Sequence, residues 1–323
     1  MLLYQNALAL LFTAIILDAI IGDPKWLWAR LTHPVVVIGR LITVLERSLN
    51  RQSFSARRRK AGGVATAMLL VGLSSAVGAA VHGLADLHPA GYALVVLFAA
   101  ILIAQKSLYE HVAAVRDGLL REGLEGGRRA VAMIVGRDPK QLDEAGVSRA
   151  AIESCAENFS DGVVAPIFWF AVAGLPGLIA YKAINTADSM IGHKTDTYRE
   201  FGWASARLDD LINLPASRLS GLLIVAVAPL LGGSAGGALH AVRNDASKHR
   251  SPNAGWPEAA MAGALGLALA GPRIYPGYTV NDPYMNRSGR KAATARDITR
   301  ALQMMLGACV LLALLVLLGA VFL

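Results

Sequence analysis

Residues 301–323 read ALQMMLGACVLLALLVLLGAVFL and contain no aspartate, glutamate, lysine or arginine. A helix needs about 20 mainly apolar residues to cross the hydrocarbon core of a bilayer, so this stretch predicts a transmembrane helix. Four other uncharged runs of similar length cover 61–85, 87–105, 162–181 and 219–242. Two further apolar segments are 1–22, which tolerates Asp18 only near its end, and 259–272, which is short for a full span.

The composition supports a membrane protein, because 54% of the 323 residues are hydrophobic and only 17% are charged. No internal repeat, low-complexity tail or Pro/Ser-rich linker divides the chain. The expected fold class is therefore all-α, a polytopic helical membrane protein with one integral membrane domain over 1–323. The net charge of +8 does not indicate a nucleic-acid partner, because the basic residues are spread over the loops without interleaved stacking aromatics.

The basic residues predict the orientation, because positively charged loops stay in the cytoplasm. None of the 31 Lys and Arg residues lies in 1–22 or in the link around Asp86. We therefore expect an inner-membrane protein with its N-terminus and the link around Asp86 outside and the polar loops of 106–300 cytoplasmic. This topology requires 162–181 and 219–242 to be broken or re-entrant helices. The residues that favour such breaks are Pro166, Pro176, Pro229, Gly232, Gly233, Gly236 and Gly237.

Between two apolar runs lies a polar stretch, NTADSMIGHKTDTYREFGWASARLDDLINL, residues 185–214. Helical spacing would place Asn185 beside Asp188, and Asp209 beside Asn213. Hard oxygens beside cations are what magnesium and a phosphorylated substrate require. The candidate metal ligands are Asn185, Asp188, Asp196, Asp209 and Asp210, and the neighbouring cations are Lys194, Arg199 and Arg207. The alternative is that these groups pair with one another and stitch two helices together.

Three further polar segments adjoin apolar runs: LDAIIGDPKWLWARLTHPVVVIG at 17–39, ESCAENFSDGVVAP at 153–166 and SKHRSPNAGWPEAAMAGAL at 247–265. Together with 185–214, they predict an active site at the membrane surface. Simpler interpretations stay open, because Asp23 and His33 each precede a proline and can end a helix, and Asp161 can cap one. The cluster ARRRKAGGV at 56–64 is either an interface anchor or a phosphate site formed by glycine amides.

In this order, several motifs closely resemble the adenosylcobinamide-phosphate synthase family of cobalamin biosynthesis, also called the CobD/CbiB family. They are Asp18 with Gly22-Asp23-Pro24, HPVVVIG at 33–39, AENFSDGVVAP at 156–166, residues 185–219, HRSPNAGWPEAAMAGALG at 249–266 and GPRIYPG at 271–277. The resemblance covers about residues 18–300. It implies an integral membrane ligase that joins the free carboxylate of adenosylcobyric acid to the amine of (R)-1-amino-2-propanol or its O-phosphate. It also implies ATP as the driving cosubstrate and Mg²⁺ as the metal.

Chemistry applied to these motifs assigns expected roles. His193 or His33 removes the ammonium proton of the amine, and Lys194 or Arg207 stabilises developing phosphate charge. The expected substrate-binding residues are Asp18, Asp23, Glu157, Asn158, Asp161, Arg199, His249, Asn253 and Glu258. Aromatic residues offer apolar surface for the corrin or form an interface belt: Tyr198, Phe201, Trp203, Trp256 and Tyr275. The sequence leaves open the preferred amine, the oligomeric state and whether the activated acid is an acyl phosphate or an acyl adenylate.

Two other functions stay possible from the sequence. An intramembrane prenyltransferase also holds magnesium diphosphate with carboxylate-rich loops, but here Thr186 occupies the position of its first aspartate and the next acid, Asp196, is too distant. A transporter would explain broken helices near polar residues, yet it predicts an internal repeat that the chain lacks.

Overall fold

The computed structural model describes residues 2–136, 138–275 and 278–322, and it describes the side chains of these residues except for 2–6, 25, 86, 273–275 and 278–281. The chain forms two compact units, each assembled from separate parts of the sequence. Unit 1 contains Met1–Ala104, Ala165–Asn213 and Val316–Leu323, and unit 2 contains Gln105–Val164 and Leu214–Leu315. The organisation as one integral domain over 1–323 stays a prediction.

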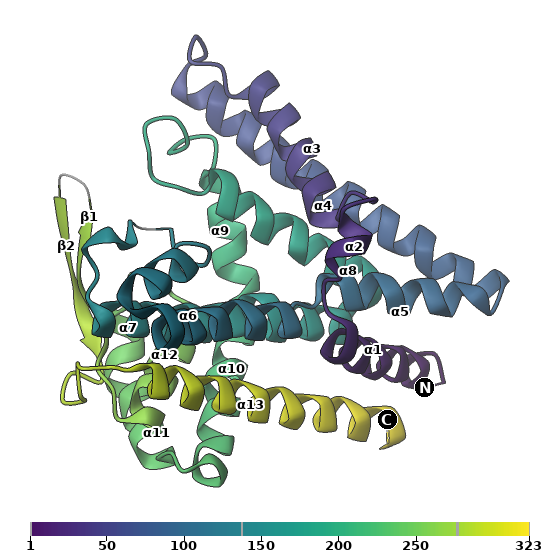
Figure 1. The fold of residues 1–323 in the computed structure, drawn as a ribbon. Coiled ribbons are helices and arrows are strands. Elements are labelled where there is room, and N and C mark those ends of the chain that lie inside the picture. The colour runs from purple at the N-terminus through teal and green to yellow at the C-terminus, as the bar shows by residue number, and fades with distance from the viewer. Residues whose placement is uncertain (1, 137, 276–277, 323) are drawn as a thin grey trace. The chain divides into compact units, whose positions relative to one another are not determined.

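Unit 1 is a helical assembly around α4 and α8, which pack against each other and against α3, α5 and α9 (Figure 1). Its helices are α1 (Leu2–Ile21), α2 (Lys25–Trp28), α3 (Pro34–Leu49), α4 (Ala56–Leu87), α5 (Ala90–Leu102), α8 (Ala165–Ile191) and α9 (Trp203–Ile212). The core lies where α3, α4 and α8 meet, and it includes Ile42, Leu70 and Ile184, all fully or almost fully buried.

Glycines set the close approach of α4 to α8 and to the loop that follows α8. A Cβ atom added at Gly78 would lie 2.5 Å from the Cα of Pro176, and one added at Gly63 would lie 1.8 Å from the carbonyl oxygen of Phe201. Along α4, the earlier glycine, Gly63, contacts residue 201, whereas the later one, Gly78, contacts residue 176. The two helices run antiparallel, and the loop after α8 lies at the N-terminal end of α4.

Both helices that we predicted to be broken are interrupted. Helix α8 has non-helical backbone angles at Ala173 and Gly174, and Pro176 follows inside the helix. The run 219–242 forms α10 (Leu214–Val227), a 3-10 turn at Ala228–Leu231, a left-handed Gly232 and then α11 (Ala235–Asp245). A left-handed conformation suits glycine because it has no Cβ atom to clash with its own backbone.

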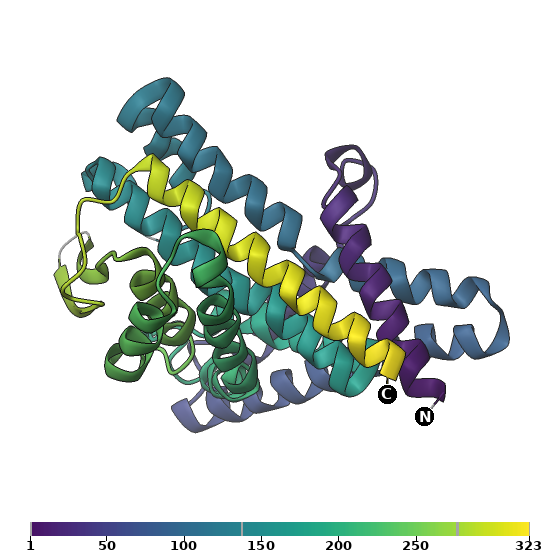
Figure 2. The same cartoon turned by 90° about the horizontal axis from the view of Figure 1, so that it is seen from below.

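Unit 2 is built around α12, whose residues are almost all buried and which packs against α7, α10 and α11. Its helices are α6 (Gln105–Val131), α7 (Glu144–Phe159), α10, α11, α12 (Gly255–Leu265) and most of α13 (Ala295–Phe322), with short 3-10 turns at Pro139–Gln141 and Ala246–Lys248. Figure 2 shows α13 as one long helix. An antiparallel hairpin of β1 (Leu269–Tyr275) and β2 (Tyr278–Met285) was not predicted, because we assigned 259–272 to an apolar segment.

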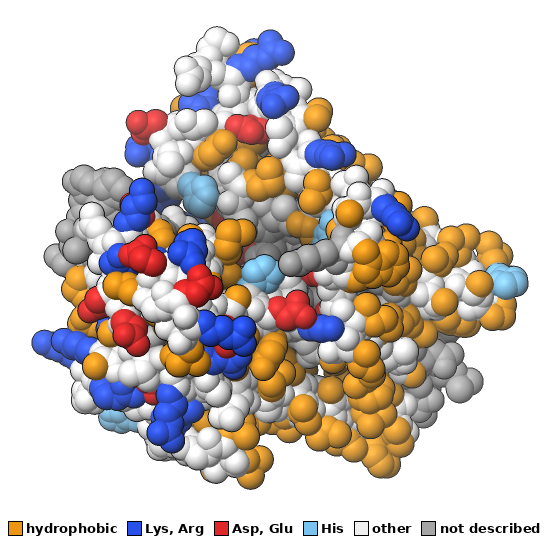
Figure 3. Space-filling view, viewed as in Figure 1, with side chains coloured by type: hydrophobic (Ala, Val, Ile, Leu, Met, Phe, Trp, Pro, Cys, Tyr) orange, Lys and Arg blue, Asp and Glu red, His pale blue; other side chains and the backbone are white. Residues whose placement is uncertain are grey.

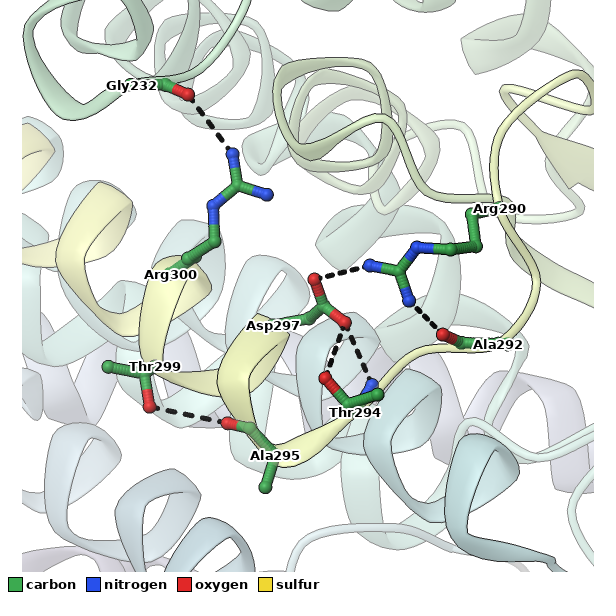
Figure 4. A network of polar contacts seen from close by, with 8 residues as sticks. All are labelled: Gly232, Arg290, Ala292, Thr294, Ala295, Asp297, Thr299 and Arg300. Carbon is green, nitrogen blue, oxygen red and sulfur yellow. Dashed lines mark hydrogen bonds and ion pairs between the residues drawn. The ribbon is translucent and has the colours of Figure 1, made fainter.

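The start of α13 is fixed by a polar network within unit 2 (Figure 4). The Asp297 carboxylate accepts hydrogen bonds from the backbone N–H and the hydroxyl of Thr294, both at 2.9 Å, and from Arg290 at 2.7 Å. Arg300 donates to the carbonyl oxygen of Gly232 at 3.1 Å. These contacts satisfy the backbone N–H of Thr294, directly before the helix, and tie α13 to the turn before α11.

Five helical stretches among the described residues are long and apolar enough to cross a membrane, and each overlaps one of the five uncharged runs found in the sequence. They are Ala56–Ala85, Ala90–Val131, Glu144–Ile191, Leu214–Leu231 and Ala295–Phe322, and Ala7–Ile21 is a shorter apolar helix. Hydrophobic side chains cover the α4–α5 part of unit 1, whereas charged side chains gather over α6 and α7 of unit 2 (Figure 3). The predicted all-α membrane-protein class is confirmed.

The close approach at Gly63 predicts a large effect of a single methyl group. Because the added Cβ of Gly63→Ala meets a backbone oxygen, the loop or the helix must move, and we expect destabilisation by about 1–3 kcal/mol. Gly72→Ala is the control in the same helix, since its Cβ would meet open space. Thermal unfolding in detergent should show a lower midpoint for Gly63→Ala alone, and equal midpoints for the two variants would contradict the packing.

Candidate functional site

The polar stretch 185–214 folds back on itself as the end of α8, a loop over 192–202 and helix α9. Asn185 Nδ2 donates to Asp209 Oδ1 at 3.2 Å, and Asn213 Nδ2 donates to Asp209 Oδ2 at 3.0 Å. The predicted neighbours Asp209 and Asn213 are therefore confirmed, and Asn185 joins α8 to α9.

Further hydrogen bonds connect the Asn185–Asp209–Asn213 network to other residues of unit 1. Tyr181 donates its hydroxyl proton to Asn213 Oδ1 at 2.9 Å, and Trp169 Nε1 donates to the carbonyl oxygen of Ile212 at 3.0 Å. Tyr181, Asp209 and Asn213 are all buried. Because both oxygens of Asp209 already accept hydrogen bonds, this carboxylate serves as a brace between the two helices.

Asp188, Asp209 and Asp210 form an acidic cluster where α8 meets α9. Asp188 and Asp210 are its more open part. The Asp188 carboxylate interacts electrostatically with Asp210 and with His193, and Asp210 interacts with Lys194. Arg207 Nη1 lies 3.9 Å from Asp210 Oδ2, three residues later in the same helix. A Cβ atom at Gly192 would lie 1.9 Å from Asp188 Oδ1, so only glycine leaves space for this carboxylate.

Asp196 differs from the other carboxylates of the stretch. Its side chain is 100% exposed, and its ion pair is with Arg199, 3.5 Å away and three residues later. The structure therefore places Asp196 and Arg199 at the surface of the 192–202 loop. Both stay predictions as ligand or substrate contacts.

The loop 192–202 is held by the start of α4, a role that the sequence did not reveal. Arg59 donates from Nη2 to the carbonyl oxygens of Asp196, at 3.0 Å, and Thr197, and from Nε to Asn50 Oδ1 at 2.8 Å. Asn50 Nδ2 also donates to the Thr197 carbonyl oxygen at 3.1 Å. Gly63 also contacts Phe201. Residues of the 56–64 cluster therefore hold the loop 192–202 in place.

The electrostatic environment separates the two adjacent aspartates of α9. Burial raises the pKa of Asp209 to about 7, and the Asp188 carboxylate adds to this, while the amides of Asn185 and Asn213 oppose it. Burial also raises the pKa of Asp210, but Arg207 and Lys194 oppose that rise. The two amide donors favour the ionised carboxylate, whereas burial and the Asp188 charge favour the protonated form.

The cluster fits a magnesium ion that is shared with phosphates. No group of three His, Cys, Asp or Glu side chains converges on a metal position within the described part of the chain. Magnesium usually binds through one or two protein carboxylates and completes its octahedron with water and substrate phosphates. Asp188 and Asp210 offer two such carboxylates, and Asn185 keeps an amide oxygen that does not take part in the brace to Asp209.

The first polar segment looks structural in its contacts. His33 Nδ1 accepts a hydrogen bond from the Val35 backbone N–H at 3.1 Å, which caps α3, and its Nε2 lies 3.6 Å from Asp23 Oδ1. The Trp28 ring packs edge-on against the His33 ring at 4.4 Å. Asp18 is buried within α1. The alternative that His33 ends a helix is wrong, because His33 caps the start of α3. The catalytic and substrate-binding roles of these residues stay predictions.

The segment 153–166 contains a π-helical turn at Ser160–Val164, which belongs to unit 2 and directly follows α7. Such turns are rare and are frequently found at functional sites. Asn158 donates to the carbonyl oxygen and hydroxyl of Ser154, at 2.9 and 3.1 Å, so its amide nitrogen is engaged within α7. Glu157 is exposed and Asp161 partly exposed, so both are accessible to a ligand.

The segment 247–265 forms a second polar cluster in unit 2. His249 Nδ1 accepts from the Ser251 backbone N–H at 3.0 Å, and its Nε2 lies 3.7 Å from Glu258 Oε1. Both side chains are almost fully buried, so this pair braces the turn before α12. Asn253, also buried, accepts from Ser217 at 3.2 Å.

Arg218 belongs to this cluster and was not among the predicted site residues. Its Nη1 donates to Asn253 Oδ1 at 3.0 Å and to Ser217 Oγ at 2.9 Å, and its guanidinium carbon lies 4.6 Å from the Trp256 ring centre. Its Nε and Nη2 donors have no partner among the described residues. The sequence offered one signal, since Arg218 stands in the PASRL segment of the quoted motif.

The aromatic residues that we considered for the corrin have different environments. Phe201 is fully buried in the core of unit 1, which excludes a direct contact with a large ligand in this structure. Trp203 is 43% exposed, with Lys60 Nζ 3.9 Å from its ring centre. Trp256 lies under Arg218, and the side chain of Tyr275 is outside the described residues.

The raised pKa of Asp209 predicts a pH dependence of stability. The folded state binds this proton more tightly than the unfolded chain, whose pKa is near 3.8, so this stabilisation is present below pH 4 and is lost as the pH rises through 7. At about 1.36 kcal/mol per pKa unit, the loss is at most about 4 kcal/mol. Asp209→Asn should therefore flatten the fall of the thermal midpoint between pH 5 and pH 8 in EDTA-containing detergent.

The exposed Asp196→Asn is the matched control for that measurement and should follow the wild-type profile. Parallel pH profiles for Asp209→Asn and the wild type would show that the Asp209 carboxylate titrates normally.

Comparison with known proteins covers the segments described above. The family model described as CobD/Cbib protein matches residues 11–305. A protein named "Cobalamin biosynthesis protein CobD" from Sinorhizobium sp is 56% identical over 96% of this chain and 97% of its own length. Proteins of the same name from Rhizobium meliloti and Rhodobacter capsulatus are 56% and 47% identical, over 94% and 98% of this chain and 93% and 100% of their own lengths. No solved structure matches the chain significantly. The chain belongs to the CobD/CbiB family.

Proposed function

We propose that this member of the family is the ligase of cobalamin biosynthesis that joins adenosylcobyric acid to (R)-1-amino-2-propanol or its O-phosphate, using ATP. Family membership over residues 11–305, with relatives named cobalamin biosynthesis proteins, supports the pathway. The observation that carries the reaction is the cluster at the end of α8, where Asp188 and Asp210 lie together beside a histidine and a lysine.

The chemistry requires activation of the acid. A carboxylate oxygen is a poor leaving group, so it must first attack a phosphorus atom of ATP to give an acyl phosphate with ADP, or an acyl adenylate with pyrophosphate. The amine nitrogen then attacks the acyl carbon, and phosphate or AMP leaves with the oxygen. The amine must lose its ammonium proton before it attacks, because only the free base has a lone pair.

The residues of unit 1 suit these steps. Asp188 and Asp210 would hold magnesium, which neutralises phosphate charge when bound. Lys194, beside Asp210, would contact the transferring phosphate. His193, beside Asp188, is the candidate base for the ammonium proton, since a neutral imidazole nitrogen can accept a proton. Asp209 holds the amide of Asn185 in place.

The polar cluster of unit 2 suits recognition of a carboxylate or amide substrate. Arg218 keeps Nε and Nη2 available, and its position is fixed by Asn253, Ser217 and the Trp256 ring. A guanidinium with two adjacent free donors matches the two oxygens of a carboxylate. We therefore add Arg218 to the proposed substrate-binding residues, together with Glu157 and Asp161 next to the π-helical turn.

Purified protein should form adenosylcobinamide phosphate from adenosylcobyric acid, aminopropanol phosphate, ATP and Mg²⁺. Asp188→Asn and Asp210→Asn should raise the magnesium concentration for half-maximal rate by about tenfold or more, because a ligand charge is lost. Glu125→Gln is the charge-matched control, because this exposed carboxylate lies outside the candidate residues, and it should leave this value unchanged. A prenyltransferase or a transporter would give no amide product, and an unchanged magnesium requirement in both variants would place the metal elsewhere.

Cytoplasmic access of the loop 192–202 is part of this proposal, because ATP is cytoplasmic. The loop 192–202 contacts Asn50 and Arg59. It therefore lies at the N-terminal end of α4, which the positive-inside rule predicts to be cytoplasmic. Single cysteines replacing Ser53 and Thr195 should therefore be shielded from an impermeant thiol reagent in intact cells, whereas one replacing His88 should react. The native Cys155 and Cys309 are buried and should give little background. Labelling at position 195 but not at 53 would contradict the shared location.

A further inference from the structure

A groove between α3 and the C-terminal half of α8 is not used by the proposed reaction. Its volume is about 660 Å³, and α3 lines it with positions from Val35 to Arg47 at spacings of three and four residues. Thr186 and Met190 of α8 form the other wall. The opposite face of α3 packs into the core through Ile42, so the helix has one fixed face and one open face.

Two arginines give this open face its charge. Arg40 and Arg47 both line the groove, and neither has a hydrogen bond or an ion pair with any described residue. They are seven residues apart on one helical face, about 10 Å along the axis, with Thr43 between them. Long guanidinium side chains converge easily over this distance. No carboxylate lines the groove to neutralise them.

The remaining wall of the groove is apolar. Val36 and Val44 are 48% and 60% exposed beside the arginines, and Met190 lies opposite, where its sulfur is 3.4 Å from a Cβ built on Gly39. The groove therefore places two unpaired guanidinium groups next to the apolar side chains of valine and methionine. Guanidinium groups match the oxygens of phosphate, and valine and methionine match an attached apolar group.

We propose that this groove binds a phosphate group that carries an apolar substituent. Two sources share this chemistry, the headgroup of an anionic phospholipid and a free phosphate ester. Helix α3 has an apolar strip with flanking arginines, as helices at a membrane interface do. The site is separate from the acidic cluster, which presents carboxylates, and its test does not depend on the ligase reaction.

The test measures binding to the full chain in zwitterionic detergent, without magnesium, using three probes. These are fluorescent phosphatidylglycerol, ATP and inorganic phosphate. Arg40→Gln with Arg47→Gln should weaken binding of the recognised probe by about tenfold or more, because each guanidinium supplies charge-assisted hydrogen bonds. Gly39→Leu should weaken it with no change of charge, because its side chain fills the groove. Arg57→Gln is the control, since it removes an exposed guanidinium of α4 outside the groove.

The probes separate the two sources. Binding of phosphatidylglycerol that ATP and inorganic phosphate do not displace identifies a lipid headgroup, whereas binding of ATP that both groove variants weaken identifies a free phosphate ester. The proposal is overturned if no probe binds the wild type, if the double variant binds as well as the wild type, or if Arg57→Gln weakens binding equally. Unchanged thermal midpoints of the variants exclude unfolding as the cause.

Discussion

The docking of the 192–202 loop on the N-terminal end of α4 is the contact on which the acidic cluster depends. A loop after a long helix would ordinarily be free to move, but here its backbone meets Gly63 so closely that no side chain fits between them. Phe201 enters the core of unit 1, and Arg59 binds two successive carbonyl oxygens of the loop. The loop therefore leads the chain from α8 into α9 along a fixed path, and α9 can return its carboxylates to the end of α8.

Within this arrangement, chemically identical side chains acquire different roles from their surroundings. Asp209 accepts two amide hydrogen bonds and so holds the helices together, and its burial raises its pKa. Asp210, its neighbour in sequence, faces Arg207 and Lys194 and is more exposed. Asp196 is fully exposed. From the sequence we predicted all of these carboxylates as metal ligands. The alternative, that a carboxylate links two helices, applies to Asp209.

Several predictions followed from short-range patterns and are confirmed. The five uncharged runs correspond to the five helices that can cross a membrane, and the breaks occur near the predicted prolines and glycines. The neighbours at three and four residues along α9 are those that the helical period requires. The β-hairpin and the site of Arg218 were missed. The hairpin pairs residues only 3 to 16 positions apart and was missed because we assigned 259–272 to an apolar segment. The contact of Arg218 with Asn253 joins residues 35 positions apart, which no local pattern reveals.

The sequence by itself determined the class of the protein, because hydrophobic length and charge distribution are properties of continuous segments. It also determined the family, because long mixed motifs recur in order. Only the tertiary structure decided which polar residues brace the fold and which stay accessible. Arg59, Asn50 and Gly63 support a loop more than 130 residues later, and no local pattern encodes such a contact. Burial and hydrogen-bond partners, which set the charge of each carboxylate, arise only when distant segments meet.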